Sequence, residues 1–232
     1  MTVTLIVGAD RGIAHAMALA LHHRGDTVIA ATLGEGADLV AEGVDVVPGF
    51  DVTSDDAVAG LSKRLTAEGT VLDRLVHVAG VMFLDGIDTV DFDDARRQFE
   101  INTLGPLRTI RGLRDHLADD AKIGIVTSRV GSIGDNGSGG DYAYRISKAG
   151  ANMVAKNLSI DLGKRGIAVQ ALHPGTVNTT LLDVMDPSVK EQAKSVLVTP
   201  EESAAGLIEV LDGLTLETAG RFQRTNGEFL PW

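Results

Sequence analysis

Residues 3–14, Val-Thr-Leu-Ile-Val-Gly-Ala-Asp-Arg-Gly-Ile-Ala, decide the fold of this chain. The β-branched run before Gly8 predicts a short strand, and the apolar stripe after Gly12 predicts a helix. A strand, a glycine turn and a helix in this order indicate the first unit of a dinucleotide-binding βαβ fold. Gly8 permits the turn, and Gly12 lets the backbone approach a pyrophosphate at the helix N-terminus. So short a motif also occurs in ordinary tight turns. The rest of the chain decides between an ordinary turn and a dinucleotide-binding turn.

Strands and helices alternate along the whole sequence. Strands are predicted at residues 2–7, 27–32, 44–50, 72–78, 123–127 and 167–172, and helices at 55–67, 92–117 and 144–162. Ser54 and Thr199 are predicted N-caps, the second before Pro200. The alternation predicts an α/β Rossmann fold, a doubly wound parallel sheet with helices on both faces. No repeat or linker divides the sequence, so residues 1–232 are expected to form one domain.

The composition argues against several classes of function. The chain has no cysteine, which removes disulfides, thiolate metal sites and cysteine nucleophiles. Its net charge of −11 argues against nucleic acid or an anionic membrane as the main partner. There is no run of about 18 apolar residues that would predict a membrane span. The first residues lack the basic start of a signal peptide. We therefore expect a cytoplasmic protein.

The end of the second strand bears on the choice of dinucleotide. A site for NAD places an acidic residue near this point to hold the ribose 2′-hydroxyl, but residues 30–33 are Ala-Ala-Thr-Leu. Arg11 in the glycine turn can instead face a 2′-phosphate, because a guanidinium makes paired hydrogen bonds to phosphate. NADP(H) is therefore favoured over NAD(H). Glu35 lies close enough in sequence to oppose this preference.

Two further strand ends carry candidate cofactor contacts. Asp51 follows the third strand, where it could meet an adenine edge. Gly80 follows the fourth strand, where a ligand that crosses the carboxyl edge of the sheet needs close backbone approach.

Tyr144 and Lys148 are four residues apart in a predicted helix and would therefore be neighbours on one face. A phenol beside an ammonium has its pKa lowered from about 10 towards working pH, and such a tyrosine can act as a general acid or base. A solvated surface pair is the alternative. Asn102 interrupts the apolar stripe of the preceding helix, either for a hydrogen bond or as an ordinary surface residue.

Several motifs agree in identity and order with one family. The chain resembles the short-chain dehydrogenase/reductase superfamily over essentially its full length. Residues 128–136, 142–148 and 227–232 look like those of its C-factor-like carbonyl reductases. The matching pieces are Gly8-x-x-x-Gly12-Ile13-Ala14, Asp51-Val52-Thr53, His77-Val78-Ala79-Gly80, Asn102, Ser128, Tyr144-x-x-x-Lys148 and Pro174-Gly175.

The resemblance implies a catalytic set of four residues and an NADP(H)-dependent reduction of aldehydes or ketones, or its reverse. Tyr144 would give a proton to the carbonyl oxygen, and Ser128 would polarise the carbonyl. Lys148 would lower the Tyr144 pKa and bind the nicotinamide ribose, and Asn102 would hold a water that links Lys148 to solvent. The implied cofactor contacts are Gly8, Asp10, Arg11, Gly12, Ile13, Thr32, Asp51, Val52, Ala79, Gly80, Tyr144, Lys148, Pro174, Gly175, Val177 and Thr179.

Some positions depart from the family pattern. His77 replaces an asparagine that ties neighbouring strands together, and a buried structural histidine is expected there. Ser128 lies sixteen positions before Tyr144, whereas Ser132 lies at the more usual twelve. We favour Ser128, since the end of a strand can fix it, and Ser132 stays the alternative.

The resemblance also bears on partners. Residues 180–198 occupy the place of a substrate lid, and residues 92–117 and 144–162 the place of a homodimer or homotetramer interface. The partner expected for the site is a small carbonyl or alcohol compound. A cofactor-binding signalling or scaffold protein without turnover is the alternative function.

Overall fold

One mostly parallel sheet runs through the computed structural model, which describes residues 2–181 and 196–232. Its eight strands are ordered β10-β9-β6-β5-β4-β1-β2-β3, and only β10 is antiparallel to its neighbour. A small second sheet pairs β7, Thr176–Val177, with β8, Leu197–Val198. The large sheet comprises β1 Val3–Val7, β2 Thr27–Ala31, β3 Asp45–Val47, β4 Leu72–His77, β5 Leu117–Val126, β6 Ala168–His173, β9 Phe222–Arg224 and β10 Phe229–Leu230.

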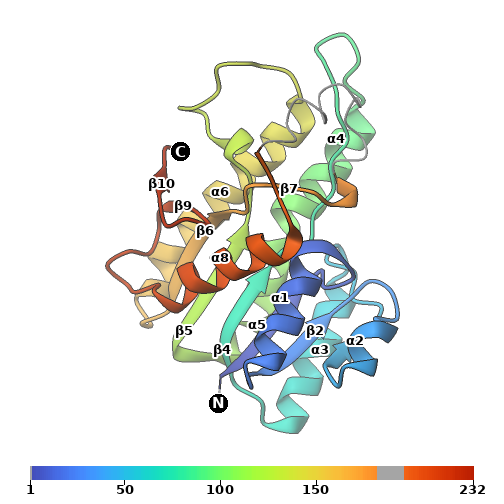
Figure 1. The fold of residues 1–232 in the computed structure, drawn as a ribbon, viewed down its shortest axis with the longest axis vertical. Helices are drawn as coiled ribbons and strands as arrows, with labels where there is room; N and C mark the ends of the chain where they lie inside the picture. Colours follow the sequence, from blue (N-terminus) through green and yellow to red (C-terminus); the bar gives the residue numbers. More distant parts are fainter. Residues whose placement is uncertain (1, 182–195) are drawn as a thin grey trace.

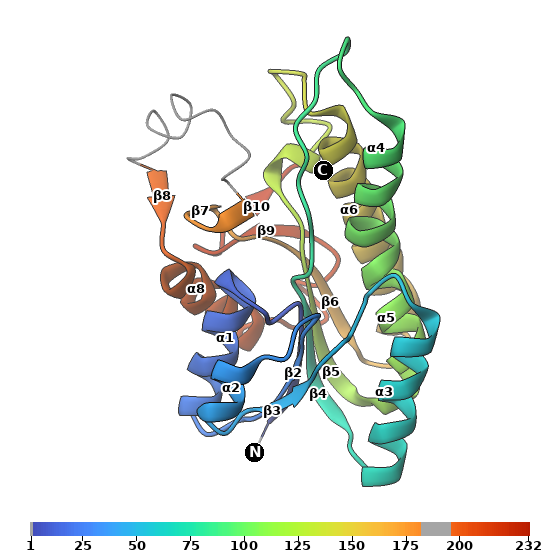
Figure 2. The same cartoon turned by 90° about the vertical axis from the view of Figure 1, so that its right-hand side faces the viewer.

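Helices cover both faces of the sheet (Figures 1 and 2). One layer contains α1 Gly12–His23, α2 Ala37–Ala41 and α8 Pro200–Asp212. The other contains α3 Asp55–Glu68, α4 Phe92–Phe99, α5 Gly105–Leu113 and α6 Tyr142–Gly163. The predicted fold class, a single-domain Rossmann fold, is confirmed.

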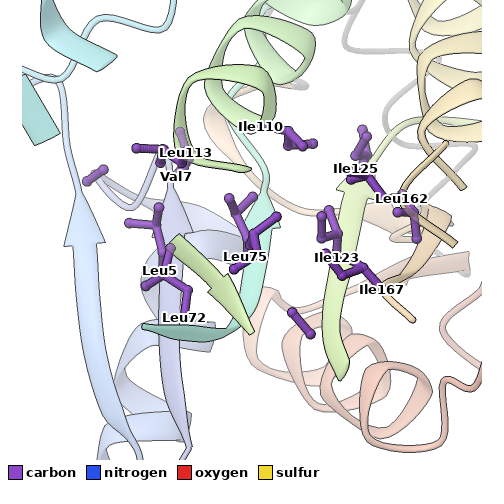
Figure 3. Packing of buried hydrophobic residues seen from close by; sticks show 14 of the residues in the cluster. Leu5, Val7, Leu72, Leu75, Ile110, Leu113, Ile123, Ile125, Leu162 and Ile167 are labelled. Carbon is purple, nitrogen blue, oxygen red and sulfur yellow. The ribbon is translucent and has the colours of Figure 1, made fainter. Parts of the chain in front are cut away.

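The strand residues alternate between two buried apolar clusters, one under each helical layer. Leu5 and Leu75 belong to the cluster beneath α3, α5 and α6, whereas Ile6 and Val76 belong to the cluster beneath α1 and α8. Figure 3 shows Leu5, Leu75 and other members of the first cluster on neighbouring strands. The alternation follows from the two-residue period of a strand. Among the described residues, no helix is both long and apolar enough to cross a lipid bilayer.

The predicted helix caps are confirmed. The Ser54 hydroxyl accepts a hydrogen bond from the Ala57 N–H at 3.1 Å and starts α3. Thr199 and Glu202 form a reciprocal capping box at the start of α8, which satisfies backbone donors that the helix itself leaves unpaired.

The prediction of one helix over residues 92–117 is wrong. After α4, a π-helical turn covers Glu100–Leu104, then α5 follows, then a 3-10 turn at Arg114–His116, and Leu117 already begins β5. Pro106 has no N–H to give to the carbonyl four residues earlier, and the Gly105 N–H bonds to the Glu100 carbonyl five residues back. The π-helical turn therefore accommodates the proline and contains Asn102.

Other differences are smaller. Strand β3 has three residues instead of the predicted seven, and β5 begins earlier than predicted. Strands β9 and β10 were not predicted, because they are too short to show a period in the sequence. Most of the expected lid, residues 182–195, lies outside the described residues.

The parallel neighbours β1 and β4 mark the point where the strand order reverses, since β2 and β3 lie on one side of β1 and β4 to β6 lie on the other. Such a topological switch point leaves a crevice at the carboxyl ends of the two strands. Gly8 and Ala79 stand where the two strands end. A Cβ added at Gly8 would lie 2.7 Å from the Ala79 Cα, and Gly8 has a φ of +89°. Only glycine satisfies both conditions.

Gly8→Ala should therefore lower the free energy of unfolding by about 3 kcal/mol or more, measured by urea denaturation. Gly25→Ala is the matched control, since Gly25 has a φ of +97° but no atom within 4 Å of an added Cβ. The free energy of unfolding of Gly25→Ala should fall by roughly 1 kcal/mol. Equal losses in the two variants would show that the contact with Ala79 contributes nothing.

Candidate active site

A cavity of about 540 Å³ follows the carboxyl edge of β1, β2 and β4. Ten of the predicted cofactor contacts line it, among them the glycine turn and the end of β4. Predicted residues in its wall are Gly8, Asp10, Arg11, Gly12, Ile13, Asp51, Val52, Ala79, Gly80 and Thr179. Other residues in the wall are Leu33, Gly34, Phe50, Val78, Val81, Arg97, Ile101, Thr180 and Leu181.

The start of α1 suits an anionic ligand. Arg11 at the N-cap makes no side-chain cap bond, and the first turn holds no acidic residue. The N–H groups there are left for a ligand in the cavity, where the helix dipole favours negative charge. A Cβ added at Gly12 would lie 3.1 Å from Thr179 Cγ2, so a larger residue at this position would crowd the space between the turn and Thr179. These residues fit the phosphates of a dinucleotide.

Asp10 lines the cavity and also holds the glycine turn in place. Its carboxylate accepts hydrogen bonds from the N–H groups of Leu33 at 3.0 Å and Gly34 at 2.7 Å. It thereby ties the glycine turn to the loop after β2. Arg11 is left as the exposed cation of the turn, and Glu35 is not among the residues that line the cavity.

The other predicted contacts are not in the cavity wall. Thr32 is fully buried, and its hydroxyl donates to the Gly34 carbonyl at 2.8 Å. The Pro174 carbonyl accepts a hydrogen bond from the Ser203 hydroxyl at 2.7 Å, and Val177 belongs to β7. Pro174, Gly175 and Val177 thus follow β6 without lining the cavity.

Arg97 on α4 is a cavity residue that no sequence motif indicated. Its guanidinium lies 5.4 Å from the centre of the Phe83 ring, a favourable cation–π distance. No carboxylate pairs with it among the described residues. A second cation, without a carboxylate partner among the described residues, therefore lines the same cavity as Arg11. Its helix, α4, belongs to the helical layer opposite α1 (Figure 2).

Helix α6 carries Tyr144 and Lys148 into the interior, where both are nearly fully buried. The Lys148 Nζ donates to the Val126 carbonyl at 3.3 Å and lies 5.7 Å from the centre of the Tyr144 ring. A Cβ added at Gly80 would be 3.3 Å from this nitrogen and 3.1 Å from Asn102 Oδ1. Helix α6, the π-helical turn that carries Asn102 and the end of β4 therefore meet at one point. Because Tyr144 and Lys148 are buried there, the surface-pair alternative for them is wrong.

Burial controls the acidity of this pair. It raises the pKa of Tyr144 to about 12, although the neighbouring Ser128 opposes the change, and Asp141 adds to the rise. Burial also lowers the pKa of Lys148 to about 8. The expectation that the Tyr144 pKa falls from about 10 towards working pH is wrong for this structure, because withdrawal from water is the largest effect and favours the neutral phenol.

The two candidate serines are placed differently. Ser128 lies close enough to Tyr144 to lower its pKa, and its hydroxyl accepts a hydrogen bond from the Val130 N–H at 3.4 Å. Ser132 is buried in the following loop, where its hydroxyl accepts a hydrogen bond from the Asp135 N–H at 3.1 Å. The structure thus brings Ser128 to the tyrosine and uses Ser132 to shape the loop.

Asn102 pins the loop after β4 to α6. Its Oδ1 accepts from the Val81 N–H at 2.9 Å, and its Nδ2 donates to the Val81 carbonyl and to the Ser147 hydroxyl, each at 2.9 Å. Both amide hydrogens are thus engaged with protein atoms. The amide therefore has no donor to offer the water that the resemblance assigned to Asn102.

Buried hydroxyls that sequence reasoning missed fix α6 in place. The Ser147 hydroxyl donates to the Tyr144 carbonyl at 2.8 Å, and the Thr103 hydroxyl donates to the Ser147 carbonyl at 2.7 Å. The Thr127 hydroxyl donates to the Lys148 carbonyl at 3.1 Å. Only the position of Ser147 beside Lys148 could have drawn attention to this set.

Comparison with known proteins agrees with this geometry. The family described as Enoyl-(Acyl carrier protein) reductase matches residues 7–208. The 1-hydroxy-2-glutathionyl-2-methyl-3-butene dehydrogenase of Rhodococcus sp. (strain AD45) is 55% identical over 232 residues, with all of both chains covered. The C-signal of Myxococcus xanthus is 40% identical over 69% of this chain and 93% of that protein. The NADPH-bound carbonyl reductase from chicken fatty liver superposes with a TM-score of 0.85 at 26% identity, over all of both chains.

The chain belongs to the short-chain dehydrogenase/reductase superfamily. It is an oxidoreductase of that superfamily, similar to dehydrogenases and carbonyl reductases.

Two buried histidines should make the protein sensitive to acid. Burial lowers the pKa of His77 to about 3 and that of His173 to about 4, whereas unfolded histidine titrates near 6.5. Between about pH 6.5 and 4 the unfolded chain therefore binds protons that the native chain does not, and the free energy of unfolding falls as the pH falls.

Replacing His77 by Asn should flatten this slope, measured by urea denaturation at about pH 7, 5.5 and 4.5. His22→Asn provides the control and should keep the wild-type slope, because His22 is only partly buried and makes no ion pair among the described residues. A slope unchanged in His77→Asn would mean that native His77 binds a proton as readily as the unfolded residue.

Proposed function

We propose that this enzyme interconverts an alcohol and its aldehyde or ketone with NADP(H), using Asn102, Ser128, Tyr144 and Lys148. The observation that carries the proposal is the burial of Tyr144 beside Ser128, a neighbour that lowers the Tyr144 pKa, with the Lys148 nitrogen 5.7 Å from the centre of the tyrosine ring. Lys148 and Asn102 border Gly80, which also lines the cavity suited to a dinucleotide.

Each of the four residues has a separate role in carbonyl reduction. A bound nicotinamide cofactor supplies the hydride. Tyr144, whose pKa is about 12, is neutral at physiological pH and has a proton to give to the carbonyl oxygen. Ser128 donates a hydrogen bond to the same oxygen as negative charge develops there. A protonated Lys148 stabilises the phenolate that remains, and Asn102 holds the loop and α6 in register. The reverse sequence oxidises an alcohol.

NADP(H) is the proposed cofactor, because Arg11 is the exposed cation of the glycine turn and a guanidinium suits a 2′-phosphate. Arg97 can approach the pyrophosphate from the other wall. The structural relative from chicken liver, which binds NADPH, supports the same cofactor.

The proposed substrates are alcohols carried on a glutathione thioether, and the corresponding aldehydes. The support is the Rhodococcus relative, which is named for a glutathionyl alcohol and is 55% identical over the whole chain. Simple aliphatic and aromatic carbonyl compounds belong in the same test panel.

We also propose a cytoplasmic homodimer or homotetramer. The helical layer that contains α4, α5 and α6 has exposed apolar side chains at Phe99, Leu107, Ile146, Met153 and Ile160. A second copy of the chain would remove this apolar area from water.

Tyr144→Phe should abolish turnover, with a loss of about 10³-fold or more in kcat, because the proton donor is missing. Oxidation of NADPH with a carbonyl panel is followed by absorbance, and NADPH affinity by fluorescence titration. The affinity should change little. Turnover retained in this variant would rule out the mechanism, and tight cofactor binding without turnover in the wild type would favour the signalling or scaffold alternative.

Arg11→Gln should weaken NADPH binding by about tenfold or more and leave NADH binding unchanged, since only NADPH carries the 2′-phosphate. Arg97→Gln is the informative contrast, because a contact with the pyrophosphate would weaken both cofactors alike. Wild-type protein that binds NADH as tightly as NADPH would contradict the proposed preference.

A further inference from the structure

The extended segment after β4, which we name the strap (residues 81–85), is held at every second residue. Val81 exchanges both backbone groups with the Asn102 amide, each at 2.9 Å. Phe83 does the same with the amide of Gln98, at 3.1 and 3.2 Å. Asp85 provides the third point, so the strap is held like a strand of a sheet although its first two partners are side chains.

The spacing of the two amides explains why this works. Gln98 and Asn102 are four residues apart, which places them one turn from each other on the helix. Four helical residues rise about 6 Å, and two extended residues advance by about 6.6 Å. One helix face can therefore hold alternate residues of the strap. Gln98 is fully buried, so both of its hydrogen bonds are protected from water.

Asp85, the third residue that holds the strap, contacts α6 instead of α4. The Asp85 carboxylate accepts hydrogen bonds from the N–H groups of Tyr142 at 2.5 Å and Ala143 at 3.0 Å. The Asp85 carbonyl also accepts from the Asp141 N–H at 2.9 Å. A residue 57 positions before Tyr142 therefore occupies the first N–H groups of the helix.

Helix α6 has no cap of its own. Asp141 at the N-cap makes no side-chain cap hydrogen bond, and its φ of 47° is the only positive φ recorded for a described non-glycine residue. Gly139 and Gly140 before it also have positive φ values. The first N–H groups of a helix need partners from outside it, and here those partners are on Asp85.

We propose that Asp85 is a positioning residue of the reaction. It caps α6 from the strap and thereby fixes Tyr144 relative to Gly80, the residue just before the strap. This inference rests on the proposed function, since it concerns the placement of the proposed proton donor. Asp85 itself touches neither Tyr144 Oη nor the cavity in the described contacts.

The position of Tyr144 makes it the residue most dependent on this cap. It is the third residue of α6, in the turn that frays first when a cap is lost. Lys148 lies one turn deeper, and its nitrogen is held by the Val126 carbonyl. Loss of the cap should therefore move the tyrosine while it leaves the cofactor cavity unchanged.

Asp85→Ala should lower kcat by about 10- to 100-fold, because a small misplacement of a reacting group is costly. Its NADPH dissociation constant should stay within about threefold of wild type. Asp85→Asn keeps an acceptor for one N–H and should recover most of kcat. This division between kcat and cofactor affinity, with rescue by Asn, would not arise from a general loss of folded protein.

Asp91 offers a matched control. Its Oδ1 accepts hydrogen bonds from the N–H groups of Asp93 at 2.8 Å and Asp94 at 3.0 Å, which caps α4 in the same way. Asp91→Ala should lower the melting temperature about as much as Asp85→Ala and keep wild-type kcat. Equal kcat in the two alanine variants would overturn the proposal.

Hydrogen exchange separates this inference from the proposed function. The amides of residues 142–145 should exchange faster in Asp85→Ala than in Asp91→Ala, whether or not a substrate has been found. Unchanged exchange would overturn the capping role. Faster exchange in Asp85→Ala, together with a wild-type protein that shows no turnover, would support the capping role and defeat only the proposed reaction.

Discussion

The site depends on a buried amine. Lys148 Nζ has been withdrawn from water, and the hydrogen bond that the structure gives it goes to the Val126 carbonyl at the end of β5. Small residues make this burial possible: a Cβ at Gly131 would lie 2.6 Å from the Lys148 carbonyl carbon, and one at Gly150 would lie 2.7 Å from the Thr103 side chain. Because α6 can lie so close to the turn after β5 and to the π-helical turn, its tyrosine and lysine are held beside the edge of the sheet where the cavity ends.

Burial shifts the two groups in opposite directions, because it favours the neutral form of each. The pKa of Tyr144 is about 12 and that of Lys148 about 8. The tyrosine therefore keeps its proton until a reaction develops charge on a neighbouring oxygen. The lysine can be charged or neutral near physiological pH. Ser128 is the one neighbour that draws the Tyr144 pKa down, so the strand end that holds this serine also makes Tyr144 more acidic than burial alone would.

Features that depend on local spacing could be predicted from the sequence, and features that depend on tertiary contacts could not. The glycine turn, the six parallel strands and the Ser54 and Thr199 caps follow from short-range patterns. The division of residues 92–117 was missed, although Gly105-Pro106 marks it, because its apolar stripe continues across the π-helical turn. The sign of the Tyr144 pKa shift depends on burial, which helical spacing does not give. Asp85 and Arg97 lie in no motif, since the groups they serve are distant in the sequence.

The most direct measurement follows a labelled hydrogen through the reaction. A glutathionyl alcohol with deuterium on its carbinol carbon is incubated with the enzyme and oxidised cofactor, and the products are analysed by mass spectrometry. We expect one deuterium in the reduced cofactor for each carbonyl product formed, while the hydroxyl proton passes to solvent through Tyr144. Deuterium that appears in water instead, or a carbonyl product that retains all of its label, would contradict hydride transfer at this site.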